Sequence, residues 1–326
     1  MMQVARRILI GLAIAAGLAA PLAFRGQGPI QPRQKSNPQT QPKQDQKIDE
    51  SHVNLRIEST LVLVPVEVSD ELNRPVSGLE KENFKVFDDK AEQKITSFAM
   101  EDDPIAVALV FDVSGSMGGN VEQTRTAAGY FFKTANPGDE FCLVVLSSEA
   151  KVAVPLTENV GNIQSQIMFD KGGGSTALLD GIYLGLNEVK KSKKLRKALI
   201  IISDGGDNNS RYTEGEVLNA IKESDVLIYG IGIFGNGDGS NYSDQVLMKD
   251  LTKISGGRLF PSNGMPLRDF ADKIVIDLRN RYMLGFSPTN PAKDGKYHRL
   301  EVKLVPPRGL PKISAHWKTG YYAASQ

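Results

Sequence analysis

The sequence contains few of the residues that form covalent cross-links or transition-metal sites. It has one cysteine, Cys142, and three histidines, His52, His298 and His316, in 326 residues. One cysteine forms no internal disulfide, and the scattered histidines match no zinc-ligand spacing. A disulfide-stabilised scaffold and a cysteine-based zinc site are therefore excluded.

An excess of charge of either sign is also missing. Lys and Arg total 39, Asp and Glu total 38, and the formal net charge is +1. Nucleic-acid-binding proteins usually carry a clear basic excess. The balance therefore gives no support for a nucleic-acid partner.

The N-terminus has the pattern of a targeting segment. Arg6 and Arg7 precede a charge-free apolar run over residues 8–24. The run of 17 residues is slightly long for the core of a signal peptide and slightly short for a membrane span of about 20 residues. We therefore expect residues 1–24 to be either a cleaved signal peptide or a retained N-terminal anchor.

A polar stretch rich in Gln and Pro follows over residues 25–53. It buries too little apolar surface to offset the entropy of ordering it, which predicts a disordered linker. Export, a tether and the scarcity of cysteine together indicate a bacterial periplasmic, cell-envelope or secreted protein.

Two segments are rich in short strand patterns. Strands are expected at 59–69, 83–88 and 94–98, and again at 281–287, 297–304 and 313–322. Each segment is small for a core of its own. We predict that residues 54–100 and 281–324 pair into one β-sandwich-like module, with two separate β extensions as the alternative.

Residues 101–280 have a different pattern. Apolar runs at 105–111, 141–146, 198–202 and 226–233 are typical of parallel strands buried on both faces, and a further short strand is expected at 151–157 as the hairpin partner of 141–146. Helices are expected near 119–135, 176–191, 213–224, 243–254 and 265–280. The alternation predicts an α/β domain with a doubly wound, mostly parallel sheet, inserted in or flanked by the β module.

Carboxylates and hydroxyls follow these buried strands. Asp112 ends the first strand and is followed by Ser114 and Ser116; Asp204 follows the third strand, and Thr176 lies in a Gly-rich loop before a helix. Ligand sites in open α/β sheets form at these carboxyl ends. Oxygen donors without His or Cys suit Mg²⁺, Mn²⁺ or Ca²⁺.

This set of residues resembles the metal-ion-dependent adhesion site of von Willebrand factor type A domains. The resemblance covers about residues 101–280, and the ending at 318–322 resembles exported bacterial proteins of this family. It implies direct metal contacts from Ser114, Ser116 and Thr176, with Asp112 and Asp204 acting through water. It also implies an open coordination position that a Glu or Asp of a protein partner fills.

The expected function is non-enzymatic, metal-dependent protein binding or adhesion. Two alternatives stay open: a cell-envelope scaffold whose metal is purely structural, and a phosphatase of the haloacid dehalogenase type. The phosphatase chemistry normally needs a second carboxylate two residues after the nucleophile, where this sequence has Ser114. The polar residues 207–209 are interpreted as a surface turn, with a role in shaping the rim of the metal site as the alternative.

Overall fold

The computed structural model describes residues 61–100, 103–169, 172–234, 242–262, 266–289 and 294–323. The predicted targeting segment and linker, and residues 54–60 of the predicted β module, lie outside these ranges. Among the helices of the described residues, none is both long and apolar enough to cross a membrane.

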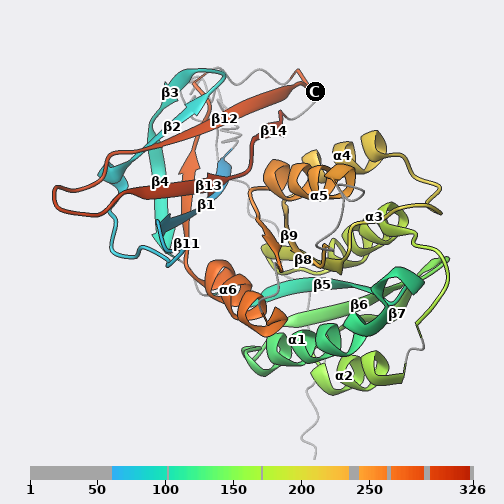
Figure 1. Cartoon of the computed structure of the whole chain (residues 1–326). Helices are drawn as coiled ribbons and strands as arrows, with labels where there is room; N and C mark the ends of the chain where they lie inside the picture. Colours follow the sequence, from blue (N-terminus) through green and yellow to red (C-terminus); the bar gives the residue numbers. More distant parts are fainter. Residues whose placement is uncertain are drawn as a thin grey trace, which may run out of the picture. The chain divides into compact units, whose positions relative to one another are not determined.

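A six-stranded sheet forms the centre of the α/β part, in the order β10-β9-β8-β5-β6-β7 (Figure 1). Neighbouring strands are parallel except β7, which pairs antiparallel with β6 at one edge, as the sequence predicts. All eight residues of β5 are buried, because helices cover both faces of the sheet. The strands are β5 (Ile105–Asp112), β6 (Glu140–Leu146), β7 (Ala150–Thr157), β8 (Arg196–Ser203), β9 (Val226–Gly232) and β10 (Leu259–Pro261).

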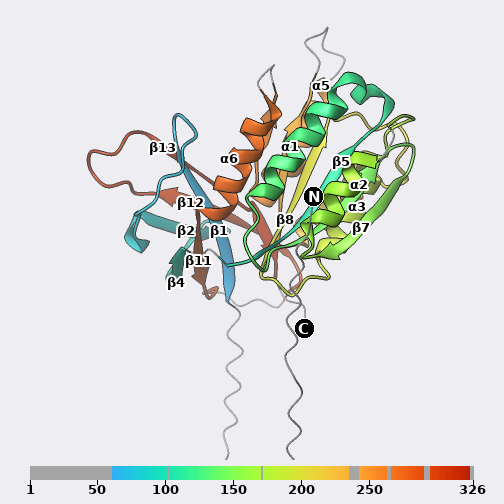
Figure 2. The same cartoon turned by 90° about the horizontal axis from the view of Figure 1, so that it is seen from below.

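Within the described residues, six α-helices cover this sheet. Their apolar faces form two separate cores, one under α1, α2 and α6 and the other under α3, α4 and α5 (Figures 1 and 2). Helix α2 and the short strand β10 were not predicted from the sequence, and the first residues of the helix predicted near 119–135 belong to a 3₁₀ helix, η2 (Gly115–Asn120). The helices are α1 (Val121–Lys133), α2 (Val160–Phe169), α3 (Leu178–Val189), α4 (Glu214–Lys222), α5 (Tyr242–Ser255) and α6 (Leu267–Arg279).

Strands from before and after the α/β part pair with each other in two four-stranded sheets, ordered β13-β1-β11-β4 and β14-β12-β2-β3. β1 pairs with both β11 and β13, and β2 pairs with β12. The inner faces of the two sheets share one apolar core. The strands are β1 (Val62–Asp70), β2 (Phe84–Asp88), β3 (Ala91–Gln93), β4 (Ile95–Met100), β11 (Arg281–Phe286), β12 (Tyr297–Leu304), β13 (Ile313–Trp317) and β14 (Gly320–Tyr322), with the 3₁₀ helix η1 (Lys81–Asn83).

The single strand expected over 313–322 is two strands, separated at Lys318 and Thr319. These two residues bind the α/β part: Lys318 Nζ donates to the Ser224 carbonyl at 2.6 Å, and Thr319 N donates to the Ile254 carbonyl at 3.2 Å. The strand breaks because its backbone turns toward these partners. The backbone of Gly256 packs closely against Lys318, because a Cβ on Gly256 would lie 2.4 Å from Lys318 N.

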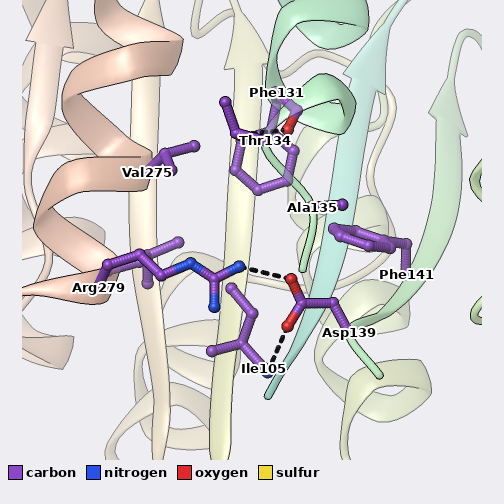
Figure 3. A pocket seen from close by; sticks show the side chains of 9 residues that line it. Ile105, Phe131, Thr134, Ala135, Asp139, Phe141, Val275 and Arg279 are labelled. Atoms are coloured by element: carbon purple, nitrogen blue, oxygen red, sulfur yellow. Dashed lines mark hydrogen bonds and ion pairs between the residues drawn. The ribbon is translucent and has the colours of Figure 1, made fainter. Parts of the chain in front are cut away.

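The end of α6 is fixed by a buried carboxylate (Figure 3). Asp139 accepts hydrogen bonds from Ile105 N at 2.9 Å, from Asn136 N at 2.8 Å and from Arg279 Nη2 at 2.5 Å. One side chain therefore joins the start of β5, the turn before β6 and the last residue of α6. Two residues later the chain enters β11, the strand between β1 and β4.

Candidate functional site

Four of the five predicted metal ligands lie directly at the carboxyl ends of β5 and β8 or in the turn that follows. Asp112 is the last residue of β5, Ser114 caps the start of η2, Ser116 is its second residue, and Asp204 follows β8. The fifth, Thr176, lies two residues before α3 and is buried. Because β5 and β8 are adjacent and parallel, their ends meet at one edge of the sheet.

Asp112 is completely buried, and both of its carboxylate oxygens accept hydrogen bonds. Ser114 N donates to Oδ1 at 2.8 Å, and Ser203 Oγ donates to Oδ2 at 2.6 Å. Burial raises the pKa of Asp112 above its usual value, because the charged form is desolvated. None of the ion pairs found among the described residues includes Asp112.

Two hydroxyl groups lie beside this carboxylate. Ser114 Oγ and Ser116 Oγ are 3.1 Å apart. Ser114 is buried and Ser116 is exposed, so the pair extends from the sheet edge toward solvent. Hydroxyl oxygens at this spacing can bind one small cation together.

The Gly-rich loop before Thr176 is held against the turn that carries the serines. Gly173 N donates to the Val113 carbonyl at 2.7 Å, and Gly115 N donates to the Gly174 carbonyl at 2.9 Å. A Cβ on Gly172 would be 2.7 Å from the Val113 carbonyl oxygen, so glycine is required for this close approach. The two loops therefore form one hydrogen-bonded unit.

Residues 207–209 form a surface turn, as interpreted from the sequence, with Asn208 and Asn209 exposed, and their side chains also hold the Thr176 loop. Asn208 Oδ1 accepts from Thr176 N at 2.9 Å, and Asp207 Oδ1 accepts from Leu178 N at 2.9 Å. Asn209 Nδ2 donates to the Ser148 carbonyl at 2.5 Å. Asp and Asn cap free backbone N–H groups at helix starts, but here the capped helix is α3, distant in sequence. The sequence therefore carried no local signal for these contacts.

A second buried carboxylate, on α3, holds the segment between β8 and α4 that contains residues 207–209. Asp180 on α3 accepts from Arg211 N at 2.8 Å and from Tyr212 N at 3.0 Å. These hydrogen bonds lower the pKa of Asp180 although burial opposes them. Its role was not recognised from the sequence, because an acidic residue in the first turn of a helix is ordinary.

Negative charge gathers at this sheet edge. Asp204 is half-buried, and its Oδ1 accepts from Gly206 N at 3.3 Å. Partial burial raises the pKa of Asp244 on α5, and the negative charges of Asp204 and Asp207 raise it further. A cation bound here would offset this repulsion.

The residues present fit a divalent cation. The site offers hydroxyl and carboxylate oxygens and lacks His and Cys, which suits a hard cation such as Mg²⁺ or Mn²⁺. Both oxygens of Asp112 already accept a hydrogen bond, and the resemblance implies that this residue would act through water. Ser114, Ser116 and Thr176 would contact the cation, and Asp204 would be held near it by Gly206.

Relatives of known sequence cover parts of this chain. An uncharacterised protein of Borreliella burgdorferi is 23% identical over 198 residues, which cover 51% of this chain and 58% of that protein. The inter-alpha-trypsin inhibitor heavy chain H4 of Bos taurus is 27% identical over 182 residues, covering 50% and 19% respectively. The matched part spans less than two thirds of the length of each of these relatives.

Solved structures with a similar fold include an aerotolerance-related membrane protein of Bacteroides fragilis, with 13% identity and a TM-score of 0.43 over 54% of this chain and 98% of that one. A proximal thread matrix protein from the mussel byssus, whose metal-ion-dependent adhesion motif holds zinc, has 17% identity and a TM-score of 0.46. The match covers 59% of this chain and 49% of that protein.

A family model matches the central part of the chain. The match covers residues 106–266, from the second residue of β5 to the residue before α6. This range includes all five predicted metal ligands and the residues that position their loops. The chain therefore carries a von Willebrand factor type A domain.

Proposed function

We propose that this protein is an exported, non-enzymatic binding module. Its type A domain binds a divalent cation, Mg²⁺ or Mn²⁺, at the carboxyl ends of β5 and β8. Ser114, Ser116 and Thr176 contact the cation, and Asp112 and Asp204 hold its water ligands. A Glu or Asp carboxylate of a protein partner completes the coordination.

The buried carboxylate of Asp112 carries the proposal. A buried charge without a partner of opposite sign is costly, and none of the ion pairs of the described residues compensates it. Its neighbours donate through Ser114 N and Ser203 Oγ, which orients the carboxylate but supplies no positive charge. A divalent cation beside Ser114 supplies that charge.

The partner carboxylate follows from the charge of the site. Three hydroxyl ligands are neutral, so the cation keeps part of its positive charge. The exposed Ser116 and the half-buried Asp204 leave the site open to solvent. A carboxylate that reaches this opening replaces a water molecule and gains a charge-assisted contact.

Manganese provides a direct test on the full chain. Bound Mn²⁺ with open positions relaxes the protons of the water it exchanges, and a carboxylate that takes such a position reduces the effect. We expect a short Glu-containing peptide to lower the relaxation enhancement, and the Gln-containing peptide to leave it unchanged.

The Ser116→Ala variant is the control that assigns the signal to this site, because it removes one ligand at an exposed position. The enhancement that the Glu peptide lowers should be absent in this variant. Binding of Mn²⁺ without any response to carboxylate peptides would contradict partner recruitment and favour a purely structural metal.

A further inference from the structure

A second cluster of ligating side chains lies in the β module, on elements far apart in sequence. Asp88 ends β2, Asp89 follows it in the turn to β3, and His298 lies on β12. β2 and β12 are antiparallel neighbours, with Asp88 opposite Leu300. The pairing brings the three side chains together, and their ligating atoms lie within 4.8 Å of one another.

One ring nitrogen faces two carboxylates. His298 Nδ1 is 3.2 Å from Asp88 Oδ1 and 3.3 Å from Asp89 Oδ2. A ring nitrogen carries at most one N–H and cannot donate fully to both. Charge-assisted hydrogen bonds are also shorter, about 2.7–2.9 Å.

These distances match the edges of a metal tetrahedron. Zn²⁺ binds His nitrogen and carboxylate oxygen at about 2.0–2.2 Å, and in a tetrahedron the ligand atoms then lie about 3.3–3.5 Å apart. A cation between the three atoms would satisfy both carboxylates and the ring nitrogen at once.

Contacts outside the three ligating atoms hold the side chains in this orientation. Tyr321 OH donates to Asp88 Oδ2 at 3.0 Å, and Arg299 N donates to Asp89 Oδ1 at 2.9 Å. Each carboxylate therefore has one oxygen fixed and turns the other toward His298. Such supporting hydrogen bonds are typical of metal sites.

A third carboxylate faces the other side of the ring. Asp294 Oδ1 is 3.6 Å from His298 Nε2. If Nδ1 binds a metal, Nε2 carries the proton, and a nearby carboxylate favours that tautomer. In this arrangement Asp88 and Asp89 are metal ligands, and Asp294 faces the proton that Nε2 carries.

We propose that Asp88, Asp89 and His298 bind Zn²⁺ through Oδ1, Oδ2 and Nδ1, with water in the fourth position. The mixed nitrogen and oxygen ligands suit Zn²⁺ better than the hard cations expected at the type A site. The metal links the β2–β3 turn to β12. The site is separate from the one under the proposed function and does not depend on it.

Cobalt serves as the visible probe, because tetrahedral Co²⁺ absorbs much more strongly than octahedral Co²⁺. We expect the full chain to take up one Co²⁺ with a tetrahedral spectrum, which Zn²⁺ abolishes in a stoichiometric titration. Asp89→Asn should weaken this binding at least tenfold. Glu82→Gln, an exposed change in the same module, should not affect it.

The Asp89→Asn variant keeps the backbone of the turn, because Asn tolerates the positive φ of 44° at this position, and the side chain is 55% exposed. Tyr321→Phe is a second variant that keeps every ligand and should weaken binding about tenfold. Ser116→Ala should leave the tetrahedral spectrum intact.

Three results would overturn the proposal. One is an octahedral spectrum alone, or none, in the parent chain. The second is unchanged Co²⁺ affinity in both Asp89→Asn and Tyr321→Phe, which would make the cluster a set of hydrogen bonds without a metal. The third is loss of the tetrahedral spectrum in Ser116→Ala, which would place the metal at the type A site.

Discussion

Replacing Asp112 by Asn separates the charge of this residue from its shape. Asn fills the same volume, its Oδ1 can accept from Ser114 N, and its Nδ2 can donate to Ser203 Oγ once that hydroxyl rotates. The variant therefore loses the negative charge while it keeps both hydrogen-bond partners. We expect opposite effects on stability with and without cation.

Without cation, the parent chain bears the cost of a buried charge at neutral pH. Because the pKa of Asp112 is raised in the folded state, stability is full below the unfolded pKa of 3.8 and is lost as pH rises through the folded pKa. Asp112→Asn lacks this loss. In the presence of EDTA it should be at least as stable as the parent at pH 7, and its advantage should shrink toward pH 4.

With cation, the order reverses. A cation at a hundred times its dissociation constant stabilises the folded parent by about 2.7 kcal/mol. For a domain of this size, that corresponds to an upward shift of about 5–11 °C in the unfolding transition of the type A domain. Asp112→Asn should show almost none of this shift.

Thermal unfolding in EDTA and in excess Mg²⁺, at pH 4 and pH 7, measures both effects. Asp250→Asn is the matched control, because it is the same change at an exposed position on α5. An Asp112→Asn variant that unfolds earlier than the parent in EDTA at pH 7 would contradict the cost of the buried charge, and one that gains as much as the parent from Mg²⁺ would contradict a role of Asp112 in cation binding.

Three further changes test contacts elsewhere in the fold and in the Gly-rich loop. Asp139→Ala removes a buried carboxylate that accepts hydrogen bonds from Ile105 N, Asn136 N and Arg279, and it should cost about 3–5 kcal/mol in chemical unfolding; a cost below 1 kcal/mol would contradict the anchoring of α6. Gly174→Ala should weaken cation affinity at least tenfold in calorimetry, because its φ is +84° and a Cβ would lie 2.3 Å from Ser148 Oγ. Burial raises the pKa of Asp277 to about 6, so stability should fall as pH rises from 3.8 to about 6, and urea unfolding of Asp277→Asn should lack this part of the pH dependence; an unchanged profile would show that Asp277 titrates normally.

The sequence was most informative where strands are buried on both faces. The apolar runs that became β5, β6, β8 and β9 are continuous because helices cover both faces, and their ends marked Asp112 and Asp204. Motif spacing then placed Ser114, Ser116 and Thr176 at the same sheet edge. These predictions depended on local pattern together with the parallel topology.

Contacts between distant segments were not predictable in this way. Nothing near residues 207–209 indicates that they cap α3, because the capped N–H groups lie about 30 residues earlier. His298 was set aside because no other histidine or cysteine lies at a ligand spacing in sequence. The partners that give it significance, Asp88 and Asp89, reach it only through the pairing of β2 with β12.

Calorimetric titration of Mg²⁺ and Mn²⁺ into the full chain tests the central claim most directly, with Ser114→Ala and Asp250→Asn titrated alongside. The proposed site predicts saturable binding of one cation to the parent and to Asp250→Asn, and loss of that binding in Ser114→Ala. Equal binding to all three proteins, or no binding to the parent at millimolar cation, would contradict the claim that this edge of the sheet is a cation site.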